Sequence, residues 1–158
     1  MPDRSDYEAL VWHRQNGGGV PHGFSIVAST GAIEAAHGVF GTVYRNWTTN
    51  EHIVVFQGPS SGLPAARANN IDVVNGRVPP SLEVAREFFD TFRLSNDIPK
   101  ENIFVSGYSA GALQAQYIGK VENIAGRAYG GPGVPDYNPS DLGSEERREL
   151  ASEAPIRT

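Results

Sequence analysis

Cysteine is absent from the 158-residue sequence. Disulfide bonds, thiolate metal sites and a cysteine nucleophile are therefore excluded. Long apolar runs are also absent, so no stretch qualifies as a transmembrane helix, and the N-terminal "MPDRSDYEAL" lacks the basic and apolar segments of a secretory signal. We therefore expect a soluble chain without a Sec-type address, in a compartment that the sequence leaves undetermined.

Clusters of lysine and arginine are missing as well. The chain has 13 basic and 18 acidic residues, which gives a formal net charge of -5 at pH 7. Because a nucleic acid or an anionic membrane surface is held by concentrated positive charge, neither is expected as the main partner. No residue pattern indicates a metal or another cofactor.

The segment "IFVSGYSAGALQ", residues 103–114, holds the most informative motif. Its centre has the pattern G-x-S-x-G, which in a nucleophile elbow places a serine on a sharp turn between a strand and a helix. The apolar residues before the motif predict a strand that ends at Val105, and the helix-forming residues after it predict a helix that starts at Ala110. Ser109 would then be the exposed nucleophile.

The two glycines of the motif, Gly107 and Gly111, lie where a strained elbow allows only small side chains. The pattern alone is a weak signal, because the sequence contains 18 glycines. The alternative interpretation is a glycine-flanked turn in which Ser109 only caps the following helix, since serine is a favoured N-cap. The strand and helix context favours the elbow.

Periodicity and turn residues predict the remaining elements. Expected strands cover 24–30, 38–46, 52–58 and a short segment from 126, and expected helices cover 5–14 (with Ser5 as its cap), 81–94 and 144–150. Because strands alternate with helices in the second half, we expect a mostly parallel sheet flanked by helices, in a single α/β domain spanning residues 1–158.

Four blocks between about residues 39 and 134 resemble the fungal-type (class three) lipases of the α/β-hydrolase fold in order and spacing. "GTVYRNWTTNEHIVVFQGP" is similar to the family's pair of strands before its oxyanion loop, and "SLEVAREFF" to its next helix. "VSGYSAGALQAQ" resembles its elbow, and "AYGGPGVPD" the loop that follows. The resemblance implies an α/β-hydrolase-like fold and the hydrolysis of carboxylic esters.

The resemblance also implies roles for individual residues. Ser109 would be the nucleophile, and the backbone N–H of Ala110 one donor of the oxyanion hole. The second donor aligns with Pro59, which has no N–H, so Ser60 would have to donate instead. Gln57 and Tyr108 replace an arginine and a histidine at supporting positions of the family.

A general base is the part of the site that the sequence does not supply at the expected place. In α/β hydrolases the acid and the histidine follow the serine along the chain, whereas all four histidines precede it: His13, His22, His37 and His52. Asp136 and Asp141 come too early to be the triad acid. We therefore expect the N-terminal part of an incomplete lipase-like domain with its acid and base beyond residue 158; a rearranged triad using His37 or His52 is the less favoured alternative.

The predicted function is a serine carboxylic-ester hydrolase that acts on a small-molecule or lipid ester, with a lipid interface as a candidate contact surface. A different class of function stays open: a non-catalytic lipase-like module that binds an acyl ligand or a partner. The same fold also hosts peptidases and acyltransferases.

Overall fold

The structure is a computed structural model and describes residues 2–58, 79–129 and 155–156. Its strands are β1 (Phe24–Ser29), β2 (Phe40–Asn46), β3 (His52–Gln57), β4 (Ile103–Tyr108), β5 (Gly126–Tyr129) and β6 (Pro155–Ile156). Its helices are α1 (Arg4–Asn16), α2 (Ala32–Ala36), α4 (Pro80–Ser95) and α5 (Ala110–Glu122), with a 3-10 turn, η1 (Lys100–Asn102), before β4. The α/β architecture expected from the sequence is confirmed.

The strands form a single sheet whose spatial order follows the chain, β1-β2-β3-β4-β5-β6. Only the pairs β3–β4 and β4–β5 are parallel, whereas β1–β2, β2–β3 and β5–β6 are antiparallel. The prediction of a mostly parallel sheet is therefore wrong. A parallel pair needs a crossover of about a dozen residues or more, and the connections from β1 to β2 and from β2 to β3 are too short to provide one.

The first helix begins earlier than expected. Asp3, not Ser5, is its N-cap: the Asp3 carboxylate accepts a hydrogen bond from the Asp6 N–H (2.9 Å), and the Asp6 carboxylate accepts one from the Asp3 N–H (3.2 Å). Ser5 lies in the first turn, where its hydroxyl contacts Asp3. The short helix α2 was not expected, and the helix predicted over 144–150 lies outside the described residues.

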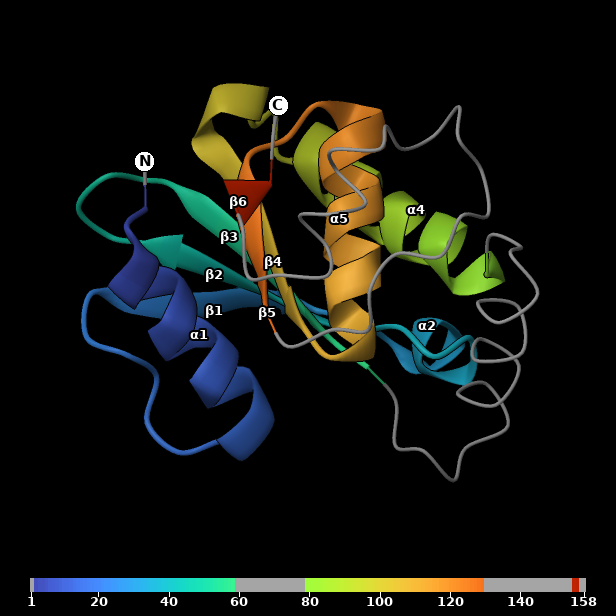
Figure 1. Ribbon diagram of the computed structural model, residues 1–158. Coiled ribbons are helices and arrows are strands. Elements are labelled where there is room, and N and C mark those ends of the chain that lie inside the picture. Colours follow the sequence, from blue (N-terminus) through green and yellow to red (C-terminus); the bar gives the residue numbers. More distant parts are fainter. Residues whose placement is uncertain (1, 59–78, 130–154, 157–158) are drawn as a thin grey trace.

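Helices cover both faces of the sheet (Figure 1), with α1 on one face and α4 and α5 on the other. The central strand β3 contributes side chains to the core on both faces of the sheet. Ile53 and Val55 pack with α1, whereas Val54 and Phe56 pack in the cluster that includes α4 and α5. All four side chains are fully buried, as the apolar run of this strand predicts.

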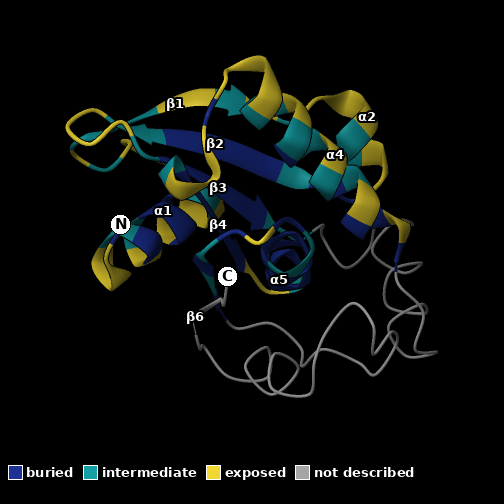
Figure 2. Ribbon diagram, turned by 90° about the horizontal axis from the view of Figure 1, so that it is seen from above, coloured by how far each residue is buried: buried dark blue, intermediate teal, exposed yellow. Residues whose placement is uncertain are grey.

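The helix after the motif is the most deeply buried of the described helices (Figure 2). Ten of the thirteen residues of α5 are buried, including the polar side chains of Gln114 and Gln116. The Gln114 side-chain amide donates a hydrogen bond to the Gly38 carbonyl oxygen at 3.1 Å, which fixes the first half of α5 against the start of β2. Among the described residues, no helix has the length and apolar character needed to cross a membrane.

Candidate active site

Ser109 is the single residue between β4, which ends at Tyr108, and α5, which begins at Ala110. The predicted strand-to-helix turn and the predicted helix start are both confirmed. The strand continues three residues beyond the expected end at Val105, because the residues up to Tyr108 keep their pairing with β3 and β5 on either side. Ser109 therefore lies at the C-terminal edge of the parallel strands, and its side chain is exposed.

The backbone of Ser109 is strained. Its φ of 56° and ψ of -126° lie in a region that residues with a side chain rarely adopt. Such a conformation costs about 1–3 kcal/mol and persists only where the surroundings enforce it. Although Ser109 occupies the N-cap position of α5, its hydroxyl forms no capping hydrogen bond. The alternative in which serine only caps the helix therefore lacks its characteristic contact.

The glycines on either side of Ser109 are required by close packing of the backbone. A Cβ atom on Gly107 would come within 3.0 Å of the main chain of Gly111. A Cβ atom on Gly111 would come equally close to the main chain of Phe56 in β3. Neither position therefore has room for a side chain, and α5 begins in direct contact with β3.

The region expected to form the oxyanion hole is described in part. The N–H of Ala110 is in the first turn of α5, where helix N–H groups have no partner within the helix, and it donates no hydrogen bond to any described residue. Gly58, directly after β3, lies against Ala110, since a Cβ on Gly58 would clash with the Ala110 Cβ. Pro59 and Ser60, the candidates for the second donor, lie outside the described residues.

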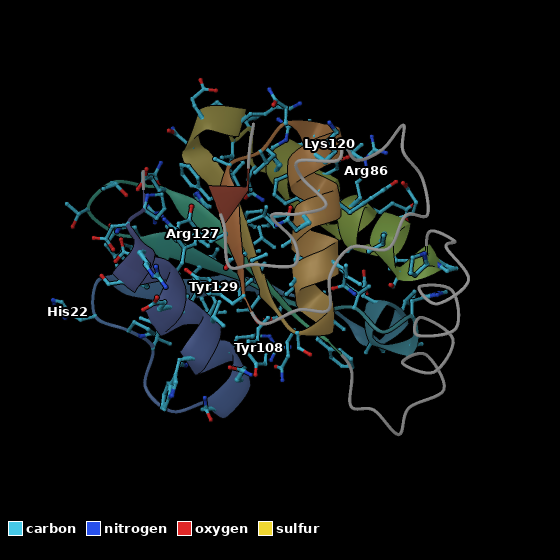
Figure 3. The ribbon with its side chains drawn as sticks, in the orientation of Figure 1. His22, Arg86, Tyr108, Lys120, Arg127 and Tyr129 are labelled. Carbon is cyan, nitrogen blue, oxygen red and sulfur yellow. The ribbon has the colours of Figure 1, made fainter. Side chains whose placement is uncertain are left out.

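None of the four histidines is hydrogen-bonded to the Ser109 hydroxyl. Both ring nitrogens of His13 have other partners: Nδ1 lies 2.8 Å from the Tyr44 hydroxyl, and Nε2 lies 3.1 Å from the Gly18 carbonyl oxygen. His52 lies at the opposite end of the parallel strands from Ser109, where it pairs with the first residue of β4. His37 ends α2, and Figure 3 shows the exposed His22 well away from Tyr108.

Arg14, which the sequence did not single out, lies near the elbow through its contact with Gln57. Gln57, the last residue of β3, pairs with Tyr108, and its side-chain oxygen accepts a hydrogen bond of 3.2 Å from the Arg14 guanidinium on α1. Burial lowers the pKa of Arg14. The guanidinium therefore approaches this edge of the sheet from a helix more than forty residues away in the sequence, and no local motif could have indicated the contact.

The face of the sheet below the elbow carries several hydroxyl groups. Tyr108, which is 37% exposed, pairs with the buried Tyr129, and the two lie close together in Figure 3. Behind them, the Ser106 hydroxyl is fully buried and has no hydrogen-bond partner among the described residues. This side of the site is therefore aromatic at the surface and polar beneath it.

In the described geometry, the exposed hydroxyl of Ser109, whose backbone is strained, lies next to the Ala110 N–H, which has no acceptor among the described residues. This arrangement is suited to nucleophilic attack on a carbonyl carbon. The candidate acids Asp136 and Asp141 lie outside the described residues. No protein-family model matches the sequence, and a search of curated proteins finds no match either.

Proposed function

We propose that this chain carries the nucleophile of a serine carboxylic-ester hydrolase with an α/β-hydrolase-like fold. The observation that carries the proposal is the backbone of Ser109, which has a positive φ between a parallel strand and a helix. Strain of this kind is retained where it has a use, and here it exposes a hydroxyl at the strand edge.

In the proposed reaction, the Ser109 hydroxyl oxygen attacks the carbonyl carbon of an ester. The negative charge that develops on the carbonyl oxygen is stabilised by the Ala110 N–H at the start of α5. The alcohol then leaves, and water hydrolyses the acyl-serine to release the carboxylic acid. The proton of Ser109 needs an acceptor, and the proposal assigns this role to a base other than the four histidines, because none of them is hydrogen-bonded to the Ser109 hydroxyl.

A fluorophosphonate probe tests whether Ser109 is a nucleophile, with the labelled residue located by mass spectrometry. We expect Ser109 to react faster than Ser95, another exposed serine at the end of α4, because only Ser109 has a helix N–H beside the phosphonyl oxygen on which negative charge develops. Labelling should disappear in Ser109→Ala and be unchanged in Ser95→Ala.

The second candidate function is a non-catalytic module that binds an acyl ligand or a partner. It is favoured by the absence of a hydrogen bond between Ser109 and any histidine, and by proline at position 59, where the resemblance requires a donor. Equal labelling of Ser109 and Ser95, or none at either, would support this module and contradict the hydrolase.

A further inference from the structure

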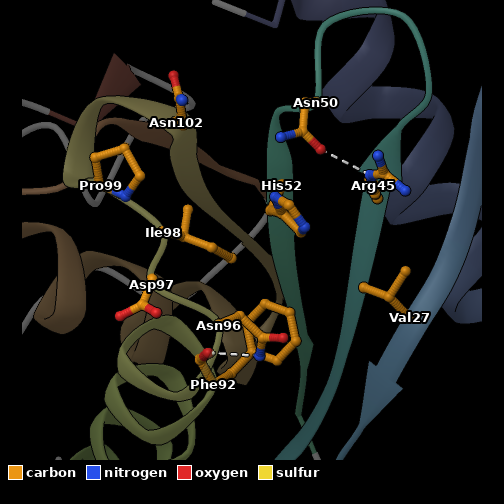
Figure 4. Close-up of a pocket in the computed structure, with 10 residues that line it drawn as sticks. All are labelled: Val27, Arg45, Asn50, His52, Phe92, Asn96, Asp97, Ile98, Pro99 and Asn102. Carbon is orange, nitrogen blue, oxygen red and sulfur yellow. Dashed lines mark hydrogen bonds between the residues drawn. The ribbon is translucent and has the colours of Figure 1, made fainter.

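A cavity lies at the end of the sheet opposite Ser109 (Figure 4). Its volume is about 360 Å³, and strands β1 to β3 form one side while the end of α4 and the turn after it form the other. His52 in this cavity pairs with Ile103, five residues before Tyr108. At about 3.3 Å per residue, the cavity lies roughly 16 Å along the strands from the elbow.

One wall of the cavity presents an oriented positive charge. The Arg45 Nε donates a hydrogen bond of 2.8 Å to the Asn50 side-chain oxygen, and the guanidinium carbon lies 4.9 Å from the centre of the Trp47 ring. No carboxylate in the described part of the chain forms an ion pair with Arg45. Within the described part of the chain, the guanidinium is thus held in place on β2 by a neutral amide and an aromatic ring.

A buried imidazole lies beside this charge. His52 is 9% exposed, its Nδ1 has no hydrogen-bond partner among the described residues, and its ring centre lies 5.8 Å from that of Phe92. Burial, and secondarily the charge of Arg45, lower the pKa of His52. The imidazole is therefore neutral at pH 7, and Arg45 is the one positive charge that lines the cavity, against a single acidic residue, Asp97.

The apolar part of the lining comes from Val27, Phe92, Ile98 and Pro99, and the side chains of Asn96 and Asn102 add polar groups. A groove of about 440 Å³ between α2 and α4 adjoins the cavity, since Phe92 and Asn96 line both. Val84, Phe88 and Ile33 continue the apolar surface along this groove. An apolar group that enters beside Arg45 could therefore extend over Phe92.

We propose that this cavity binds a small monocarboxylate with an apolar tail. The carboxylate would pair with the Arg45 guanidinium beside the Asn50 amide, and the tail would pack on Phe92 and Ile98. A guanidinium fork matches the two oxygens of a carboxylate. The lining has one cationic side chain, Arg45, and one acidic side chain, Asp97. It therefore balances the single negative charge of a carboxylate better than the double charge of a phosphate monoester.

The probe that tests the site is hexanoate, added to the 158-residue Ser109→Ala variant so that no turnover is possible. We expect the ring resonance of His52 to shift, and its pKa to rise, because a bound anion nearby favours the protonated imidazole. Hexanamide, the neutral analogue, should bind at least tenfold more weakly. Each added methylene from butyrate to hexanoate should strengthen binding by at most about fourfold.

Variants separate the contribution of charge from that of folding. Arg45→Gln should weaken hexanoate binding about tenfold or more, whereas the matched change Arg4→Gln on the exposed face of α1 should leave it unchanged. Val27 is 43% exposed, so both Val27→Glu and Val27→Gln should fold; only the glutamate should repel the carboxylate. Thermal unfolding of each variant checks that the fold is retained.

Three results would each overturn the proposal: a His52 resonance that does not respond to hexanoate, equal binding of hexanoate by Arg45→Gln, or equal binding of hexanamide. Tighter binding of hexyl phosphate than of hexanoate would likewise contradict a monocarboxylate site. Because the measurements use Ser109→Ala, their outcome does not depend on whether the proposed esterase reaction takes place.

Discussion

The main-chain N–H of Ser109 donates a hydrogen bond of 3.0 Å to the carbonyl oxygen of Tyr129. Ser109 has already left β4, so this bond joins the elbow to the end of the neighbouring strand β5. The Ser109 carbonyl oxygen in turn accepts a hydrogen bond of 3.0 Å from the Ala112 N–H. The strained residue is thus held from both sides by main-chain contacts that do not depend on its side chain.

Replacing Ser109 by glycine should therefore relieve strain without disturbing those contacts. Ser109→Gly should have a higher free energy of unfolding than Ser109→Ala by about 1 kcal/mol, since the relief of about 1–3 kcal/mol exceeds the greater flexibility of unfolded glycine. Urea denaturation of the two variants measures the difference. Equal stability would show that the positive φ of Ser109 is not strained.

The elbow glycines should not tolerate a methyl group. Gly107→Ala and Gly111→Ala should each lower the free energy of unfolding by about 3 kcal/mol or more, because each new Cβ meets main-chain atoms that cannot move aside. Gly19→Ala is the matched control, since a Cβ on Gly19 meets nothing within 4 Å. Comparable losses in all three variants would contradict the packing argument.

Ser106→Ala should stabilise the protein. The Ser106 hydroxyl is fully buried without a partner among the described residues, and an unpaired buried polar group costs about 1–3 kcal/mol. We expect the free energy of unfolding to rise by about 1 kcal/mol in urea denaturation, with the fluorophosphonate labelling of Ser109 unchanged. A loss of stability would show that this hydroxyl has a hydrogen-bond partner.

Ester hydrolysis by the 158-residue chain should respond to an added base. With p-nitrophenyl butyrate, we expect Ser109-dependent turnover barely above background, because no histidine is hydrogen-bonded to the Ser109 hydroxyl. Free imidazole at millimolar concentration should raise it. The quantity to measure is the difference between the native chain and Ser109→Ala, which removes direct hydrolysis by imidazole itself.

Substantial Ser109-dependent turnover without imidazole would show that a base is already present in the chain. The pH profile of that activity would then test whether a histidine provides it. An imidazole effect of the same size in Ser109→Ala would contradict the role of Ser109.

Protonation of His52 should lower the free energy of unfolding in mild acid. Its pKa in the folded protein is lowered from 6.5, so the unfolded chain takes up the proton first as the pH falls. The stability contribution of neutral His52 is therefore complete above pH 6.5 and is lost as the pH falls from there through the folded-state pKa. Urea denaturation measures the free energy of unfolding at both pH values, and this free energy should fall less between pH 7.5 and pH 5 for His52→Gln than for the native chain.

Much of the fold follows from local sequence patterns. The apolar run of Ile53 to Phe56 predicts a strand buried on both faces, and this strand and the one expected over 38–46 are both confirmed. Strand direction was predicted less well, because alternation with helices in the second half of the chain says nothing of the antiparallel pairs at the two ends of the sheet. Connection length, which is visible in the sequence, is the better guide for β1–β2 and β2–β3, but the long connection between β5 and β6 would allow either direction.

The candidate site likewise has one part that could be predicted from the sequence and one part that could not. The turn at Ser109 and the helix start at Ala110 could be predicted because the motif and its flanking periodicity occupy one continuous segment. The contact of Arg14 with Gln57 could not, because it depends on how α1 packs across the sheet. The cavity around Arg45 and His52 likewise combines segments that lie apart in the sequence, and nothing in any one of them indicates it.

The contact of Gly58 with Ala110 limits which sequences the elbow can accept. These two positions share one small volume, since even a methyl group on residue 58 would overlap that of residue 110. A randomised library at residue 58 should therefore yield folded proteins only with glycine, as long as residue 110 keeps its methyl group. The elbow thus sets the size of a residue at the end of the neighbouring strand, which lies outside the G-x-S-x-G pattern.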